Sequence, residues 1–142
     1  MSRLLLTRRV AFAAAHRYHR AGWSEERNAE VFGACAHPHF HGHSYRCDVT
    51  VTGTLSEETG FVADLGLLDS LLEKEVRQRF DHRNINLDVE EFGEGGMIPT
   101  GENLARFIAG KLQAALADSG TILVRVTVAE DDTLSSTWEA GA

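Results

Sequence analysis

A short segment in the first third of the chain carries most of its histidines. Residues 37–43 (HPHFHGH) hold four of the seven. In an extended segment, residues i and i+2 point to the same side. His41 and His43 can therefore direct both imidazoles towards one point, and Gly42 between them adds no side chain. Two convergent imidazoles are two of the three protein ligands of a catalytic zinc site, whose fourth position stays open.

A third ligand is needed, and His16 is the best candidate. It closes the first expected strand, which can lie beside the strand that follows His43. His19, His37 and His39 compete for the same role. The alternative interpretation is that the histidine-rich segment is a polar surface loop or an adventitious metal site.

A thiol and an Asp-His pair stand out as candidate acid–base groups. Cys35 lies six residues before His41, and cationic or metal neighbours lower the pKa of a thiol; the competing interpretation is a small buried residue. Asp81-His82 follows an expected helix and is either a solvated turn or a proton relay to Cys35. Cys47 falls on the apolar face of an expected strand and is assigned to the core.

One further carboxylate, Glu130, ends an expected strand just before Asp131 and Asp132. On the residues alone, a solvated turn between two strands is the favoured interpretation. The alternative is that Glu130 accepts hydrogen bonds from the amino and ring N–H groups of a heterocycle, a bidentate pairing that an ionised glutamate makes well.

The size and composition of the chain limit the classes of protein to consider. Its 142 residues, 43% of them hydrophobic, predict one soluble domain spanning residues 1–142. A net charge of −7 argues against general nucleic-acid binding. Two cysteines are too few for a disulfide scaffold, so we expect a reduced, cytoplasmic setting. No apolar run approaches the roughly 20 residues of a membrane span.

Hydrophobic periodicity predicts four strands and two main helices. We expect strands at residues 4–15, 44–53, 122–128 and 133–139, a short helix at 24–32, helices at 64–79 and from Thr100 to about Ser119, and a loop at 81–97. Asp64 and Thr100 are the expected N-caps. The order predicts an α+β domain, with a four-stranded antiparallel sheet and two helices on one face. Oligomerisation is one way to cover the edges of so small a sheet.

Taken together, these segments resemble the 6-pyruvoyltetrahydropterin synthase family, which includes the 6-carboxytetrahydropterin synthases. The motifs that carry the resemblance lie at residues 12–16 (FAAAH), 35–45 (CAHPHFHGHSY), 60–65 (GFVADL), 81–86 (DHRNIN), 99–103 (PTGEN) and 128–130 (VAE). Each motif is modest alone, but their order and spacing together are specific.

The resemblance implies a tunnelling fold, in which sheets join around a threefold axis into a barrel and two trimers stack into a hexamer. It implies that zinc is bound by His16, His41 and His43, and that the active sites lie between subunits. The implied roles of the remaining residues are a catalytic triad of Cys35, Asp81 and His82, a pterin anchor at Glu130, and a pterin-pocket segment at Thr100 and Glu102.

The implied activity is a zinc-dependent lyase that converts 7,8-dihydroneopterin triphosphate to 6-pyruvoyltetrahydropterin and releases triphosphate. The six-residue spacing from Cys35 to His41, with Pro38 inside it, resembles the pyruvoyl branch. The alternatives are a 6-carboxytetrahydropterin synthase, which acts on the same substrate and releases acetaldehyde in a deazapurine (queuosine) pathway, and a catalytically silent zinc- or pterin-binding homologue. Asp131, where the family often has threonine, departs from the family pattern, as do His37 and His39.

Overall fold

The structure is a computed structural model that describes residues 2–141. Its elements follow the chain in this order: β1 (Leu6–His16), α1 (Glu25–Phe32), the 3-10 turn η1 (Gly33–Ala36), β2 (His41–Thr52), α2 (Leu65–Leu72), the π-helical segment η2 (Glu73–Arg77), α3 (Gln78–Phe80), β3 (Arg83–Asn84), α4 (Ile85–Asp88), the 3-10 turn η3 (Glu90–Phe92), α5 (Gly101–Leu116), β4 (Ile122–Ala129) and β5 (Ser135–Glu139).

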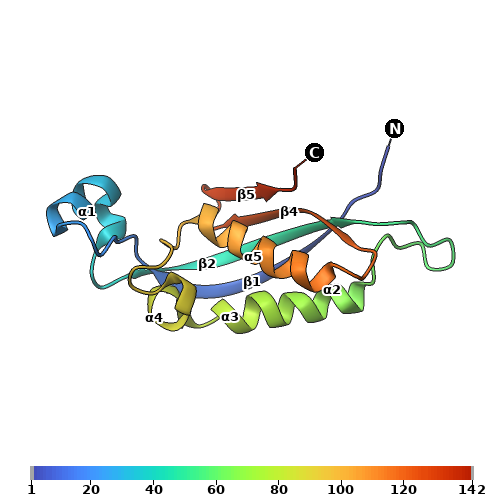
Figure 1. Cartoon of the computed structure of the whole chain (residues 1–142), viewed down its shortest axis with the longest axis horizontal. Coiled ribbons are helices and arrows are strands. Elements are labelled where there is room, and N and C mark those ends of the chain that lie inside the picture. Colours follow the sequence, from blue (N-terminus) through green and yellow to red (C-terminus); the bar gives the residue numbers. More distant parts are fainter. Residues whose placement is uncertain (1, 142) are drawn as a thin grey trace.

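A five-stranded sheet in the order β3-β1-β2-β4-β5 runs the length of the molecule. Figure 1 labels four of its strands, β1, β2, β4 and β5. The four long strands pair antiparallel, as the sequence predicts. The expectation of a purely antiparallel four-stranded sheet needs correction, because β3 adds a fifth strand that runs parallel to β1. Only Ala14 and Ala15 pair with it, and two residues are too few to show a period of two in the sequence.

Helices cover one face of this sheet (Figure 1). Segments α2, η2 and α3 form the continuous helix expected after Asp64, whose carboxylate accepts a hydrogen bond from the Leu67 amide at 3.1 Å. Thr100 caps α5 through the Asn103 amide at 3.2 Å, also as expected. The apolar stripes of both helices are buried against the alternating inner face of β2, which consists of Tyr45, Cys47, Val49 and Val51.

The prediction of a loop at residues 81–97 is wrong, because this stretch contains β3, α4 and η3. Asn84 caps α4 by accepting from the Leu87 amide at 3.2 Å, and Ile85, Val89 and Phe92 are buried in the core. These elements are two to four residues long, too short for a hydrophobic period to be recognised. The position of these elements is important because the candidate residues Asp81 and His82 lie directly before β3.

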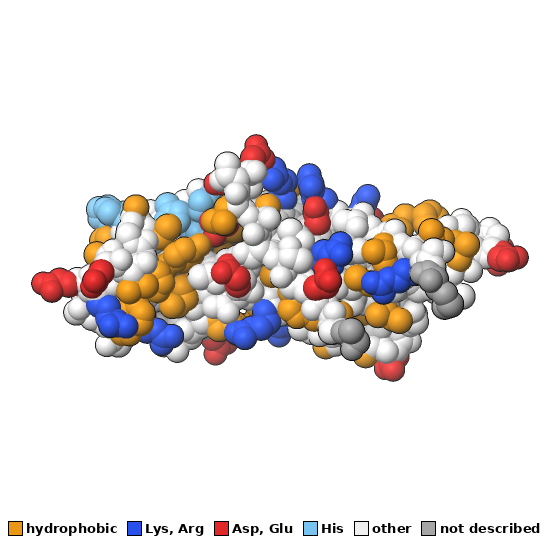
Figure 2. Space-filling model, turned by 90° about the horizontal axis from the view of Figure 1, so that it is seen from above, with side chains coloured by type: hydrophobic (Ala, Val, Ile, Leu, Met, Phe, Trp, Pro, Cys, Tyr) orange, Lys and Arg blue, Asp and Glu red, His pale blue; other side chains and the backbone are white. Residues whose placement is uncertain are grey.

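The surface around this core is mixed in charge. Figure 2 shows acidic and basic side chains interspersed over one face, with the histidines gathered towards one end of the molecule. Within residues 2–141, no helix is both long enough and apolar enough to cross a membrane.

Candidate metal centre

Three histidines meet where β1 ends and β2 begins. The antiparallel register places His16 opposite His41 and Ala14 opposite His43. The ring centroid of His16 lies 4.6 Å from that of His41 and 5.1 Å from that of His43, and one nitrogen of each of the three rings lies within 4.8 Å of the others. The expectation that these three residues come together is confirmed, and the group can hold a metal ion.

His16 is held as a neutral ligand. Its side chain is fully buried, and its Nδ1 lies 2.8 Å from the Pro99 carbonyl oxygen. Because a carbonyl only accepts, this contact places the proton on Nδ1 and leaves Nε2 with a lone pair, the form that a metal needs. Burial lowers the pKa of His16 to about 4, so the ring stays uncharged at neutral pH. The Tyr45 hydroxyl lies 3.0 Å from Nδ1 and packs beside the same ring.

His43 supplies the observation that most directly fits a metal. Its Nε2 is buried and has no hydrogen-bond partner among the described residues. The nearest charged atom, Glu130 Oε2, is 3.7 Å away, which is too long for a hydrogen bond. A buried polar atom without a partner is costly, and a metal ion between the rings would satisfy it. Burial also lowers the pKa of neighbouring His41, with a smaller contribution from His43.

Glu130 lies beside the triad, immediately after β4. It is 6% exposed, so the solvated turn favoured by the sequence alone is not what the structure shows. The Tyr18 hydroxyl donates to Glu130 Oε1 at 2.6 Å. Burial and this hydrogen bond raise the pKa of Tyr18 well above its usual value, which keeps the hydroxyl protonated as a donor. The carboxylate is thus oriented by a partner and lies close to the candidate metal ligands.

Cys35 lies in η1, the short turn that precedes β2. The Tyr18 amide donates to the Cys35 carbonyl at 2.8 Å, so the thiol-bearing turn is tied to the residue whose ring packs on His16 and His41. Cys35 is half-buried, whereas Cys47 is fully buried in the core as expected, and neither forms a disulfide. A half-buried thiol is open to a substrate in a way that Cys47 is not.

Asp81 and His82 are placed elsewhere, at the edge of β1. The Ala13 amide donates to Asp81 Oδ1 at 2.9 Å, and the His82 amide donates to the Ala13 carbonyl at 2.6 Å. The Ala13 hydrogen bond is the main cause of the lowered pKa of Asp81. Asp81 Oδ2 lies 3.1 Å from His82 Nδ1, as expected for a carboxylate that orients an imidazole.

The His82 side chain lies largely at the surface of the subunit. It is 84% exposed, and the backbone has a φ of 60°, in the left-handed region that non-glycine residues seldom adopt. No hydrogen bond or ion pair joins Cys35 to Asp81 or His82 within residues 2–141. One subunit therefore places Glu130 beside the histidine triad and ties the Cys35 backbone to Tyr18, and no hydrogen bond among the described residues links this group to the Asp-His pair.

The two residues predicted to line the pterin pocket, Thr100 and Glu102, lie at the start of α5, directly after Pro99, whose carbonyl contacts His16. The Thr100 hydroxyl accepts the capping hydrogen bond of α5, and exposed Glu102 accepts from the Ser136 hydroxyl at 2.8 Å. The competing histidines lie outside the triad: His19 contacts Glu25, and the exposed His37 and His39 contact each other.

Three supporting residues were missed from the sequence: Tyr18, Tyr45 and Pro99. A weak signal existed for the two tyrosines, because each lies two residues from a ligand and so shares its side of an extended segment. Nothing in the sequence indicates that the Pro99 carbonyl, 83 residues from His16, accepts the hydrogen bond that fixes the His16 ring.

Comparison with known sequences places this site in a family context. The sequence model described as 6-pyruvoyl tetrahydropterin synthase matches residues 5–140. Human 6-pyruvoyl tetrahydrobiopterin synthase is 37% identical over 127 residues, which cover 89% of this chain and 85% of the human protein. The 6-carboxy-5,6,7,8-tetrahydropterin synthase of Bacillus subtilis is 35% identical over 89 residues, which cover 61% of this chain and 56% of that protein.

Solved structures agree with this picture. The structure of Caenorhabditis elegans 6-pyruvoyl tetrahydropterin synthase superposes with a TM-score of 0.89 at 31% identity, covering 99% of this chain and 100% of that chain. The Plasmodium falciparum 6-pyruvoyl tetrahydropterin synthase superposes with a TM-score of 0.67 at 18% identity, covering 99% of each chain, and supports the fold alone.

Proposed function

Because this chain belongs to the 6-pyruvoyl tetrahydropterin synthase family, we propose that it is a zinc-dependent lyase that converts 7,8-dihydroneopterin triphosphate to 6-pyruvoyltetrahydropterin and releases triphosphate. The observation that carries the proposal is the unpartnered Nε2 of His43, which lies within a three-histidine group and next to a buried carboxylate. A metal site and a heterocycle anchor side by side suit a substrate that has both a polar ring and vicinal hydroxyls.

Zinc fits the donor set, since three neutral imidazoles with an open fourth position are typical of catalytic zinc. When bound by His16, His41 and His43, it would supply Lewis-acid stabilisation of negative charge on the substrate's side-chain oxygens. The unfilled position is left for substrate, because no fourth side chain joins the group within the described residues.

The chain's own residues supply binding and proton transfer. Glu130 accepts hydrogen bonds from the amino and ring N–H groups of the pterin, and Tyr18 fixes the angle of that carboxylate. Thr100 and Glu102 line the rim of the pterin pocket. The Cys35 thiolate removes a proton from the substrate side chain, and the Asp81-oriented His82 returns one.

Assembly completes this site. Since the His82 side chain is 84% exposed and has no hydrogen bond to Cys35, we propose that it serves the Cys35 and histidine triad of a neighbour within a homohexamer of two stacked trimers. Both cysteines are free, which fits a cytoplasmic enzyme.

The pyruvoyl product is favoured over the carboxy product by two observations. The human pyruvoyl relative aligns over 89% of this chain, against 61% for the Bacillus subtilis carboxy relative. The six-residue spacing from Cys35 to His41 also resembles the pyruvoyl branch. A role in tetrahydrobiopterin-type synthesis follows from this choice, and a role in queuosine synthesis follows from the alternative.

Incubation of the zinc-loaded protein with 7,8-dihydroneopterin triphosphate, followed by mass spectrometry, tests the proposal. We expect 6-pyruvoyltetrahydropterin and one triphosphate per turnover. A carboxylated pterin together with acetaldehyde would assign the chain to the carboxy branch. Unchanged substrate in the presence of bound zinc would indicate a catalytically silent homologue.

A further inference from the structure

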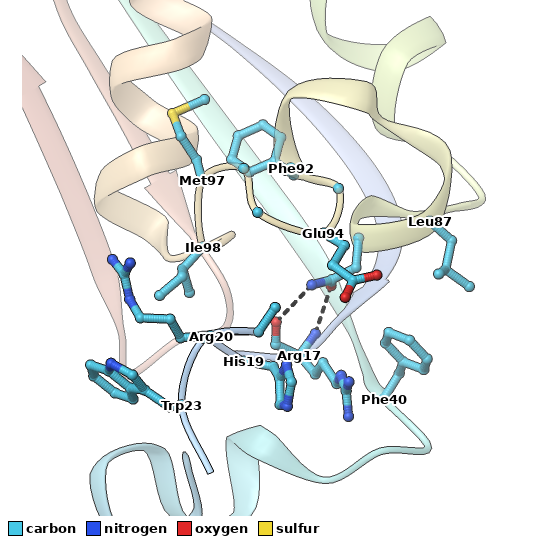
Figure 3. Close-up of a pocket in the computed structure, with 16 residues that line it drawn as sticks. Arg17, His19, Arg20, Trp23, Phe40, Leu87, Phe92, Glu94, Met97 and Ile98 are labelled. Atoms are coloured by element: carbon cyan, nitrogen blue, oxygen red, sulfur yellow. Dashed lines mark hydrogen bonds between the residues drawn. The ribbon is translucent and has the colours of Figure 1, made fainter. Parts of the chain in front are cut away.

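A cavity of about 490 Å3 lies beside the metal centre, between residues 17–23 and the glycine-rich loop at residues 93–98 (Figure 3). The proposed function leaves it unused. Its lining includes Arg17, His19 and Arg20, against a single acidic residue, Glu94. A basic cavity is unexpected in a chain with a net charge of −7.

The arginines around this cavity differ from the others in having no acidic partner. Half of the chain's arginines form ion pairs with aspartate or glutamate, namely Arg8, Arg9, Arg46, Arg77, Arg79 and Arg125. Within residues 2–141, the arginines without such a partner are Arg3, Arg17, Arg20, Arg27, Arg83 and Arg106. Four of these six surround the cavity: Arg17 and Arg20 line it, Arg27 stacks on the lining residue Trp23, and Arg106 contacts the lining residue Met97.

Three of these four guanidinium groups, those of Arg17, Arg20 and Arg27, lie over aromatic rings and not beside carboxylates. Arg17 lies 5.5 Å from the centroid of Phe40, and Arg20 lies 5.5 Å from that of Trp23, as Figure 3 shows for the paired side chains. Stacking uses the flat face of a guanidinium and leaves its N–H edge free. A free, fixed N–H edge is suited to bidentate contact with phosphate oxygens.

The cavity shares its backbone with the metal centre. Arg17 directly follows His16, Phe40 directly precedes His41, and Ile98 directly precedes Pro99, whose carbonyl holds His16. The Asn86 side chain accepts from the Arg17 amide at 2.9 Å and donates to the Arg17 carbonyl at 3.1 Å, which fixes this segment on both sides. Because consecutive Cα atoms are only about 3.8 Å apart, each of these cavity residues lies close to its neighbour in the metal centre. A long ligand can therefore reach from one site to the other.

We propose that this arginine cavity is a polyphosphate subsite, with Arg17 and Arg20 as its principal anion contacts. It binds the triphosphate tail of the substrate while the reacting side chain lies at the histidine triad. The identification of the ligand as the substrate's tail rests on the proposed function, whereas the anion site itself rests on the arginines alone.

Calorimetric titration with inorganic triphosphate tests the subsite in the absence of turnover. We expect Arg17→Gln and Arg20→Gln each to weaken binding about tenfold or more, because charge-assisted hydrogen bonds to phosphate are strong. Arg3→Gln is the matched control, since it removes the same charge from an exposed arginine that also has no acidic partner. Circular dichroism of each variant excludes misfolding as the cause of a loss.

Kinetics with 7,8-dihydroneopterin triphosphate separates the two proposals. We expect the same two variants to raise KM about tenfold or more, with Arg3→Gln unchanged. Arginine-dependent triphosphate binding without turnover would support the subsite and overturn the proposed function. Turnover with KM and triphosphate affinity unchanged in both variants would overturn the subsite alone. An equal loss of triphosphate affinity in Arg3→Gln would show a general effect of charge and would also overturn the subsite.

Discussion

The two carboxylate oxygens of Glu130 have different surroundings in this site. One oxygen accepts from the Tyr18 hydroxyl at 2.6 Å, and the other lies 3.7 Å from a histidine nitrogen that has no hydrogen-bond partner. The carboxylate is buried, so its remaining hydrogen-bonding capacity is directed into the site rather than towards water. Tyr18 is therefore a positioning residue for the proposed pterin anchor.

Replacing Tyr18 by phenylalanine tests this positioning role. The variant leaves a buried carboxylate oxygen without its donor, so we expect a loss of about 1–3 kcal/mol in the free energy of unfolding. We also expect a raised KM for the pterin substrate with a smaller change in kcat. Denaturant titration and steady-state kinetics give both numbers. An identical KM in wild type and Tyr18→Phe would contradict the role.

Cys35 is expected to act on protons and not on metal. Cys35→Ala should retain zinc and the oligomer but lower triphosphate release about 100-fold or more, the typical contribution of a positioned base. Cys47→Ala removes a thiol from the core and serves as the control for the loss of sulfur alone. Normal turnover by Cys35→Ala would remove this residue from the mechanism.

His41 is expected to bind the metal. His41→Ala should lower the zinc content measured by elemental analysis, since two remaining imidazoles make an incomplete site. His39→Ala provides the control, because it removes an exposed imidazole from the same segment. Full zinc content in His41→Ala would show that the ligand set is wrong.

At the scale of elements, the long strands and helices could be predicted and the short ones could not. The alternation of Tyr45, Cys47, Val49 and Val51 predicts β2. The His-Gly-His spacing predicts that His41 and His43 converge, whereas the residues alone leave His16 as the best of several candidates for a third ligand, and the family resemblance selects it. Segments β3, α4 and η3 have no recognisable period, and their positions depend on burial of residues such as Ile85 in a core that only the folded chain forms.

The Pro99 carbonyl and the orientation of His82 were unpredictable for a related reason. The first depends on a contact between residues 83 positions apart, and the second on a backbone φ of 60° that the residue type does not indicate. Tertiary packing determines both features, and the pattern of residues in a short stretch of sequence does not reveal tertiary packing.

The Asp-His pair lies directly before β3 and α4. Substitution of Ile85 tests whether burial of α4 stabilises this part of the chain. Ile85→Ala removes a fully buried side chain from α4, which typically costs about 2–5 kcal/mol of stability. Leu87→Ala removes a similar side chain from the same helix at a position that is 72% exposed, and it should be nearly neutral. Urea unfolding at a fixed protein concentration gives the free energy of unfolding of both variants. Equal destabilisation would contradict the conclusion that α4 is held in place by burial of Ile85.

In the molecule as a whole, both edges of the sheet are available for association with another subunit. Strand β5 is an outer strand, and on the opposite side β3 covers only two residues of β1. Unpaired strand edges are sites for pairing with another chain. The exposed His82 adds a functional reason for assembly, since its proposed partner Cys35 does not contact it within one subunit.

Mixed oligomers test whether the active sites are shared. Cys35→Ala and His82→Ala should each be inactive alone, but oligomers formed by refolding the two together should regain activity. Sites that draw one residue from each of two subunits would be intact in about one quarter of cases in an equal mixture. Mixing each variant only with itself is the control, and no recovery in mixed oligomers of normal size would place both residues in one subunit's site.

X-ray absorption spectroscopy at the zinc edge reports directly on the proposed three-histidine zinc centre. For the purified, zinc-loaded protein, the three-histidine centre predicts one zinc per chain, with nitrogen and oxygen neighbours at about 2.0–2.1 Å. A sulfur neighbour at about 2.3 Å would make Cys35 a ligand instead of a base. Failure to retain zinc at all would contradict the metal centre from which the proposed function is derived.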